Sequence, residues 1–345
     1  MEHQFTLEKY NGKNRFACPN CGKKELALYI NIETNEYLNE DVGRCNREQS
    51  CGYHLKPKEY FQAGGEPHNN IENLTDRANR IFQPKSTPII QKECYHETDL
   101  MLKTLKAYEQ NNFVQFLKNS FSDAVTDRLV NRFKIGTTKH FEGGTVFWYI
   151  DKNEVVRAGK IMQYNAMTGK REKTELEDGT KKPKISYVHS ILKIQDYQIT
   201  KTLFGEHQLN YENSKKPIAI CESEKTAILS SLYFGGFVWL ACGSLSNLTA
   251  ERLKPLEGRK IMLFPDCGID KGNGTPFGNW SKKAEAISKE LNCQINISNF
   301  LEKYATDEQK EHGLDLADFL LERIDRTFGH SWVLTENDYP KFWDL

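Results

Sequence analysis

The sequence predicts an α/β protein whose C-terminal part is built on a parallel sheet. Three short apolar runs, each bounded by polar residues or glycine, are typical of buried strands and cover residues 217–221, 237–242 and 260–264. Helical patterns at 224–234, where Ser223 is placed to cap the helix, and at 249–254 separate them. Because strand and helix alternate, we expect parallel strands, right-handed crossovers and flanking helices. A smaller α+β region and a cysteine-rich N-terminal segment precede this sheet.

Length and charge set limits on the function. The chain has 345 residues, enough for more than one domain, and its 47 basic and 47 acidic residues cancel. Any surface for nucleic acid must therefore be local. No apolar run is long enough to span a membrane and no signal-peptide pattern is present, so we expect a cytoplasmic protein without a membrane partner. In a reducing compartment, nine cysteines favour metal ligands and packing residues over disulfides.

The first predicted domain, residues 1–62, is a zinc β-ribbon. Its candidate ligands are Cys18, Cys21, Cys45 and Cys51. The Cys18-Pro19-Asn20-Cys21 turn has the usual spacing of a zinc knuckle, and a closed shell of thiolates serves structure rather than catalysis. The second pair is more widely spaced, so His54 is an alternative to Cys51 as the fourth ligand. The other alternative is that the cysteines bind no metal.

The ribbon also carries basic and aromatic residues that could contact single-stranded DNA. Cations neutralise phosphates and aromatic rings stack on bases. The residues are Arg15, Lys23, Lys24, Arg44, Arg47, Tyr29, Tyr37 and Tyr53. The alternative is a solvated surface on a structural module. Residues 63–95 follow as a predicted linker, rich in glycine, proline and asparagine, with one short helical turn near 77–82.

Residues 96–205 form the predicted α+β subdomain. Helical spacing of apolar residues indicates two helices within 98–118, and a third begins after Ser122 and ends before Gly136. Strong alternation in 144–164 indicates antiparallel strands, on which Arg157 and Lys160 lie. The charged loop that follows, at 169–184, suits a solvated hairpin tip better than a phosphate clamp.

Two acids directly follow strands of the predicted parallel sheet. Glu222 follows the first run and Asp266 follows the third. Ligands of such sheets lie beyond the carboxyl ends of the strands, and oxygen ligands suit Mg²⁺ or Mn²⁺. The alternative is that each acid only caps the helix after its strand.

These residues resemble the Toprim domain of primases, topoisomerases and some nucleases. The resembling features are the Glu-x-Glu after the first strand, Gly243 after the second and Pro265-Asp266 after the third. Residues 203–207, Leu-Phe-Gly-Glu-His, resemble a segment in the primase half of phage primase-helicases, and 146–161 resemble the β-rich subdomain of that core. The whole chain resembles zinc-ribbon proteins with a Toprim-like core carried by mobile elements of Bacteroidetes-type bacteria.

One position departs from the Toprim pattern. The family places a second aspartate two residues after the first, and Gly268 stands there in this chain. Asp270 lies two residues further on, and Asp315 and Asp318 resemble the family's later acidic stretch. The departure leaves two possibilities, a site for a single ion or a site rebuilt from these later acids.

The resemblance implies a primase-like nucleotidyl transfer on single-stranded DNA, with nucleotides as substrates. Glu222 would be the general acid/base or metal organiser and Asp266 a magnesium ligand, with Asp270 or Asp318 as helper. Arg157 and Lys160 would face nucleic acid, and the alternative for Lys160 is an exposed strand cation. Lys225 could touch a phosphate or, alternatively, pair with Glu224 or a neighbouring acid.

Two other functions stay open. A non-catalytic Toprim-like module could bind DNA for replication or mobilisation, which Gly268 favours, or a Toprim nuclease could cleave phosphodiesters. The implied Toprim-like domain covers 206–330, and 331–345 form a tail. No Walker phosphate loop is present, so any helicase partner is expected to be a separate protein.

Overall fold

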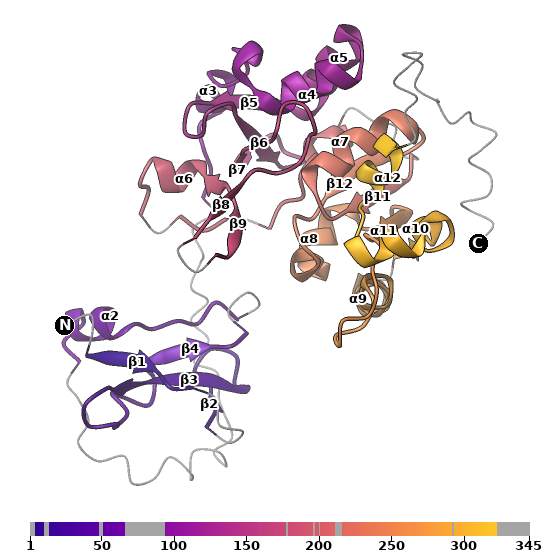
Figure 1. Cartoon of the computed structure of the whole chain (residues 1–345). Coiled ribbons are helices and arrows are strands. Elements are labelled where there is room, and N and C mark those ends of the chain that lie inside the picture. The colour runs from indigo at the N-terminus through magenta and orange to yellow at the C-terminus, as the bar shows by residue number, and fades with distance from the viewer. Residues whose placement is uncertain are drawn as a thin grey trace. The chain divides into compact units, whose positions relative to one another are not determined.

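The computed structural model divides the chain into two compact units, Met1–Gln91 and Lys92–Leu345 (Figure 1). The residues described are 4–9, 14–47, 51–65, 94–176, 179–195, 197–199, 201–210, 216–291 and 293–322. The predicted linker therefore lies outside the described residues from 66 to 93, as do the helical turn near 77–82 and the tail at 331–345. No helix among the described residues is long and apolar enough to cross a membrane.

The N-terminal unit is a small antiparallel sheet. Its central strand, β3 (Lys24–Asn31), pairs with β1 (Phe5–Leu7), β2 (Phe16–Ala17) and β4 (Gly43–Cys45). The helix α2 (Pro57–Gln62) follows, with Pro57 in its first turn, where the missing N–H costs no hydrogen bond. Among the residues that the structure describes, Leu26 and Leu28 form a small core with the cysteines and the rings of Phe16, Tyr37 and Tyr53.

The second unit contains the predicted parallel sheet, with strand order β12-β11-β13-β14. The strands are β11 (Ile218–Cys221), β12 (Val238–Ala241), β13 (Ile261–Phe264) and β14 (Ile295–Ile297). All three pairings are parallel, as the alternation of strand and helix predicts. The strand β11 occupies a central position, so the residue after it lies between those that follow β12 and β13.

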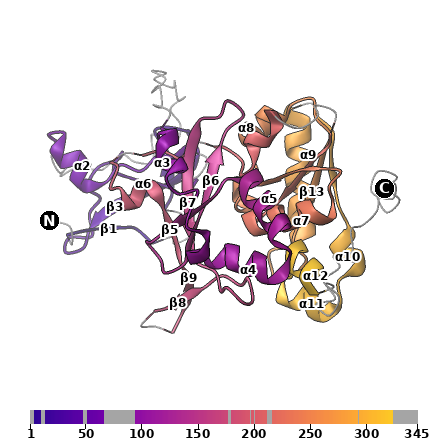
Figure 2. The ribbon, with the colours of Figure 1, turned by 90° about the horizontal axis from the view of Figure 1, so that it is seen from above.

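Both faces of this sheet are buried, which explains why its strands are apolar throughout. Alternate residues of β11, such as Ala219 and Cys221, share one core with α7 (Glu224–Tyr233) and α12 (Leu316–Glu322). Ile218 and Ile220 share the other core with α8 (Ala250–Leu253) and α9 (Pro276–Leu291). Figure 2 shows the two pairs of helices on opposite sides of β13.

Helix boundaries follow the caps in part. Ser223 caps α7 as predicted, since its hydroxyl accepts the Thr226 N–H at 3.1 Å. The apolar spacing of residues 280–291 predicts a helix, and the structure begins this helix, α9, four residues earlier, at Pro276. Gly313, in the left-handed conformation, ends α11 (Asp307–His312) ahead of α12. The remaining short helix of this region is α10 (Phe300–Tyr304).

The α+β region forms an antiparallel sheet of order β10-β7-β6-β5. The strands β6 (Gly144–Ile150) and β7 (Val156–Met162) are the predicted pair, and β5 (Ile135–Thr138) and β10 (Ile185–Tyr187) widen the sheet. The helix α5 (Asp123–Phe133) ends before Gly136 as predicted, with Lys134 in the left-handed cap conformation and Gly136 in β5. The α+β region also contains α3 (Thr98–Leu102), α4 (Asn112–Ser120), α5 (Asp123–Phe133), α6 (Val188–Ile191), β8 (Lys173–Glu175), β9 (Lys181–Pro183) and the 3-10 turn Tyr108–Gln110. Three further 3-10 turns, Glu206–Asn210, Leu245–Asn247 and Lys254–Leu256, belong to the region of the parallel sheet.

The two sheets of the second unit share one hydrophobic core. Phe147 and Tyr149 on β6 pack in the same cluster as α7 and one face of the parallel sheet. Phe204 joins them, because its backbone pairs with Ala241, the last residue of β12, and its ring contacts both aromatic residues. Gly205 permits this path, since its φ is +84° and a Cβ would lie 2.9 Å from the Trp239 carbonyl oxygen.

Candidate active site and zinc centre

The four predicted zinc ligands form one cluster in the N-terminal unit. All their sulfur atoms lie within 4.8 Å of one another. The Cys18 and Cys51 sulfurs are 3.5 Å apart, and those of Cys21 and Cys45 are 3.9 Å apart. Tetrahedral zinc with Zn–S bonds of about 2.3 Å needs sulfurs about 3.8 Å apart. The thiols therefore fit a structural zinc ion.

His54 has a different role from the thiols. Its Nε2 lies 3.0 Å from the Tyr29 hydroxyl, and the two rings are stacked with centroids 6.2 Å apart. Cys51 completes the group of ligands instead. Burial raises the pKa of the Cys18 thiol to about 12, so the thiolate form needs a cation beside it.

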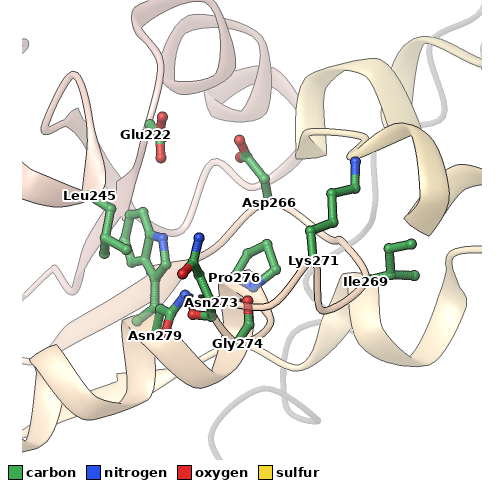
Figure 3. Close-up of a pocket in the computed structure, with 10 residues that line it drawn as sticks. Glu222, Leu245, Asp266, Ile269, Lys271, Asn273, Gly274, Pro276 and Asn279 are labelled. Carbon is green, nitrogen blue, oxygen red and sulfur yellow. Dashed lines mark hydrogen bonds between the residues drawn. The ribbon is translucent and has the colours of Figure 1, made fainter.

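Glu222 and Asp266 lie together at the carboxyl edge of the parallel sheet. Cys221 of β11 pairs with Phe264 of β13, so the acids that follow these two strands meet at one edge. Both line a cavity of about 300 Å³ (Figure 3). The parallel register therefore brings together two carboxylates that are separated by more than forty residues in the sequence.

Electrostatics at this edge favour a cation. Burial, then repulsion from Asp315 and Glu222, raises the pKa of Asp266 well above its usual range. Burial also raises the pKa of Glu222, although the charge of Arg171 and a hydrogen bond with the Leu245 backbone partly oppose this. A divalent cation would relieve the repulsion and favour both ionised forms. The donor set, carboxylate oxygens, suits Mg²⁺ or Mn²⁺.

The other predicted magnesium ligands have protein partners. Asp270 is exposed, and its carboxylate accepts the backbone N–H groups of Gly272 at 2.7 Å and Gly274 at 2.9 Å. Asp318 accepts a hydrogen bond from the Lys225 ammonium. In the described part of the chain, the cysteine cluster is the only group of three or more Cys, His, Asp or Glu residues close enough to hold a metal together. The carboxylate site thus consists of two acids, Glu222 and Asp266, and neither Asp270 nor Asp318 joins them as a further ligand.

Asp315 is the later acid with the strongest effect on Asp266. Its carboxylate accepts hydrogen bonds from the Thr226 hydroxyl at 2.9 Å and the Asp318 N–H at 2.8 Å. These bonds fix Asp315, which is only 9% exposed, against the first turn of α7. The sequence places Asp315 in an acidic stretch, but only the packing of α12 on α7 brings it near the pair.

The position of the missing second aspartate is crowded by a proline. A Cβ at Gly268 would lie 2.9 Å from Cγ and 3.1 Å from Cδ of Pro276, the first residue of α9. Contacts this short force a shift of the proline ring or the loop. Pro276 therefore leaves room for a glycine at position 268. An aspartate there would require the first residue of α9 to lie elsewhere.

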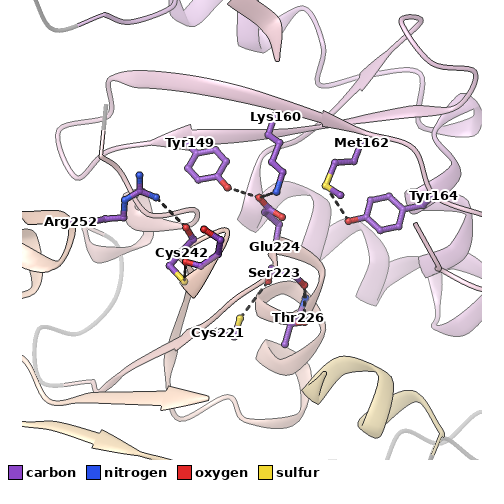
Figure 4. Close-up of polar contacts among 11 residues, drawn as sticks. Tyr149, Lys160, Met162, Tyr164, Cys221, Ser223, Glu224, Thr226, Cys242 and Arg252 are labelled. Atoms are coloured by element: carbon purple, nitrogen blue, oxygen red, sulfur yellow. Dashed lines mark hydrogen bonds and ion pairs between the residues drawn. The ribbon is translucent and has the colours of Figure 1, made fainter. Parts of the chain in front are cut away.

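The predicted nucleic-acid contacts also have internal partners. The Lys160 ammonium lies 2.8 Å from the Glu224 carboxylate, and Tyr149 donates to the same oxygen (Figure 4). Arg157 donates to Asp151 at 2.7 Å, on the same antiparallel sheet. Their contact with a template stays a prediction.

Arg171 is a charged residue near the site that sequence reasoning assigned to a solvated loop. Its backbone pairs with Tyr164, a buried residue of the shared core, and its charge acts on both Glu222 and Asp266. The local sequence gives one relevant sign, Gly169, whose left-handed φ of +63° turns the chain back beside Tyr164. The turn alone does not show that Arg171 acts on Glu222 and Asp266, because these acids lie far away in the sequence.

Two family models match parts of the chain. Residues 111–267 match a domain of unknown function, DUF6371, and residues 3–66 match a family described as a zinc beta-ribbon finger. The second match covers the whole cysteine cluster. No curated protein matches the chain.

Several solved primase structures are similar to the chain. A DnaG primase catalytic domain bound to single-stranded DNA aligns with a TM-score of 0.41 and 13% identity, over 67% of this chain and 81% of that one. The RNA polymerase domain of Mycobacterium tuberculosis DnaG gives 0.41 and 13%, over 68% and 80%. The zinc-binding and RNA polymerase domains of Aquifex aeolicus primase give 0.35 and 14%, over 92% and 83%.

Proposed function

We propose that the protein is a primase-like, DNA-binding nucleotidyltransferase that uses Mg²⁺ or Mn²⁺ on single-stranded DNA. The observation that carries this proposal is the position of Glu222 and Asp266, which follow neighbouring parallel strands and line one cavity. The raised pKa values of both carboxyls support a cation between them. The zinc-binding cluster in a separate unit supports a module for template contact.

The positions of Asp266, Glu222 and Asp315 suggest a different role for each. Asp266 would hold the metal with Glu222, and the raised pKa of the partly buried Glu222 suits a general acid or base. When bound, the metal neutralises charge that develops on phosphoryl oxygens. Asp315, fixed by hydrogen bonds from the Thr226 hydroxyl and the Asp318 N–H, adds negative charge that acts on Asp266.

The test is incorporation of labelled ribo- and deoxyribonucleotides on single-stranded DNA with Mg²⁺ or Mn²⁺. We expect template-dependent oligonucleotides from the wild type and none from Glu222→Gln or Asp266→Asn. Glu285→Gln is the matched control, because Glu285 is exposed and pairs only with Lys289 on α9. Activity that persists in both site variants would exclude the assigned roles.

A second candidate, a DNA-binding module without catalysis, has its own supporting observation. Pro276 crowds the position at which a second aspartate would enter, and two carboxylates, Glu222 and Asp266, are the acids that line the cavity among the described residues. If wild type makes no product while both site variants bind single-stranded DNA as tightly as wild type, this candidate replaces the first. Cleavage of circular DNA in the same metals would instead identify a nuclease.

A further inference from the structure

The two faces of the antiparallel sheet are covered to different depths. Its inner face, with Phe147 and Tyr149, packs in the core that the sheet shares with α7. Its outer face carries a separate small core, in which Met101 of α3 and Val188 of α6 pack with Trp148. These helices have five and four residues, and Figure 2 shows both on the side of β7 that faces away from α7. The helical cover of the outer core is therefore thin.

Exposed apolar side chains gather around this thin cover. Twelve large apolar residues of the described chain are exposed, and six of them lie here, each between 37% and 56% exposed. These six form the outer patch: Tyr95, Ile185, Ile191, Leu192, Ile194 and Ile199. Single exposed apolar residues are ordinary, whereas a cluster of them marks a surface for a partner.

Stacked rings join the two chain segments that supply the outer patch. The Tyr197 ring stacks on His96 and on His189, with centroids 4.8 Å and 4.7 Å apart. Tyr95 directly precedes His96 in the chain, whereas the Ile194 N–H donates to the His189 carbonyl oxygen at 3.0 Å. The two segments therefore lie side by side, and the outer patch is one surface.

The size of the outer patch matches one side of a protein interface. At about 200 Å² for each fully exposed residue, its members present roughly 500 Å² of mostly apolar surface. A standard interface buries about 800 Å² on each partner, and about 60% of this area is apolar. The outer patch thus supplies about the apolar area that a specific interface needs.

The charges around the outer patch are self-complementary. Glu97 and Asp99 lie exposed at the start of α3, and Lys193 lies exposed just after α6. The side chains of these three residues form no ion pair within the described part of the chain. In a two-fold dimer the same surface meets itself, so the acids of one copy can oppose Lys193 of the other. Nucleic acid would instead meet exposed acids and apolar side chains, which disfavours it as a partner.

We propose that the outer patch binds a second copy of this chain and forms a two-fold symmetric dimer. The apolar side chains form the centre of the interface, and Glu97, Asp99 and Lys193 form ion pairs at its rim. The inference does not depend on the proposed nucleotidyl transfer, because none of these residues lines the cavity that contains Glu222 and Asp266.

The test is sedimentation equilibrium of the zinc-loaded full chain from about 1 to 100 µM, because interfaces of this size have micromolar or lower dissociation constants. We expect the mass of the wild type to rise from that of one chain to that of two. Leu192→Asp should raise the dissociation constant at least about a hundredfold, because a carboxylate enters the apolar centre twice in a symmetric dimer. Met167→Asp is the matched control, since Met167 is 70% exposed and lies outside the outer patch.

Reversal of single charges tests the two-fold symmetry. Lys193→Glu and Glu97→Lys should each weaken self-association about tenfold, because like charges then oppose each other. A mixture of the two variants should associate about as tightly as wild type, since each chain restores opposite charges with the other. Circular dichroism should show unchanged folding in every variant, because the substituted residues are all exposed.

Three results would contradict the inference. A wild type that stays monomeric up to about 100 µM would overturn it and leave the outer patch to a different protein. Dimerisation of Leu192→Asp with the affinity of wild type would place the interface elsewhere on the chain. A mixture of the two charge variants that associates no better than either variant alone would overturn the two-fold arrangement.

Discussion

Lys160 on β7 and Glu224 at the start of α7 form a buried ion pair between the antiparallel sheet and this helix, with Nζ and Oε1 2.8 Å apart. Their side chains are 11% and 1% exposed. Burial alone would raise the pKa of Glu224, but the Lys160 charge and the hydrogen bonds from Lys160 and Tyr149 outweigh it and lower the pKa. The pair therefore fixes the antiparallel sheet to the helix that begins two residues after Glu222.

We expect Lys160→Met to destabilise the protein by about 3–5 kcal/mol, because it leaves the Glu224 carboxylate buried without a cation. Urea unfolding measures this loss. Because folding lowers the pKa of Glu224, the contribution of the pair is present above the ordinary value of 4.5 and is lost as the pH falls through the lowered value. The difference between wild type and variant should shrink in acid.

Two further variants test how much the buried Lys160–Glu224 pair itself contributes to stability. The double variant Lys160→Met/Glu224→Gln should recover part of the lost stability, since no charge is then left buried. Lys181→Met is the matched control, because Lys181 pairs with Glu175 at 3.5 Å while both are 63% exposed. Its cost should be below about 1 kcal/mol. Equal costs for the two single Lys→Met variants would contradict a structural role for the buried pair.

Removal of zinc should unfold the N-terminal unit and leave the second unit folded. The small core around Leu26 and Leu28 depends on the thiolate cluster, and zinc binding contributes about 10–16 kcal/mol in comparable zinc-finger peptides. Hydrogen exchange of residues 4–65 before and after chelation measures the effect. Cys45→Ser should lose the ion, whereas His54→Gln should keep one zinc per chain. Loss of zinc in His54→Gln would contradict the four-cysteine site.

The sequence predicted the features that depend on local pattern. Glu222 and Asp266 each follow an apolar run, so strand alternation alone brought them to one edge. The Cys18–Cys21 knuckle identified the zinc site for a similar reason, since its spacing is set by the metal. Ser223 was recognised as a cap because the hydroxyl bonds within its own turn.

Features that depend on distant partners were not predictable. A single lysine in a strand gives no sign of an acid 64 residues away, so Lys160 was assigned to the template rather than to Glu224. Gly268 showed that an aspartate was missing, but not that Pro276 crowds its position.

A side chain at position 268 should be costly. Gly268→Ala places a Cβ 2.9 Å from Pro276 Cγ, and overpacking of this kind costs about 1–3 kcal/mol. Gly268→Asp should therefore lower stability without adding nucleotidyl transfer. Gly235→Ala is the control, since a Cβ there meets nothing within 4 Å and should change stability little. Thermal unfolding of the three variants provides the comparison, and an unaffected Gly268→Ala would show that Pro276 moves freely.

The stability of the metal-free protein should fall as the pH rises above the ordinary Asp266 pKa of 3.8. Folding raises this pKa, so the folded state binds the proton more tightly and loses stability as the carboxyl ionises beside Glu222 and Asp315. Asp266→Asn removes the ionisation and should flatten this pH dependence, with a gain on the order of 1 kcal/mol at neutral pH. Mg²⁺ should stabilise the wild type by about 2.7 kcal/mol at a hundred times its Kd, and the variant much less. Urea unfolding across the pH range, with and without Mg²⁺, measures both effects. Equal stabilisation of wild type and Asp266→Asn by Mg²⁺ would place the ion elsewhere, because Mg²⁺ bound to the Asp266 carboxylate must bind more weakly once that carboxylate is removed.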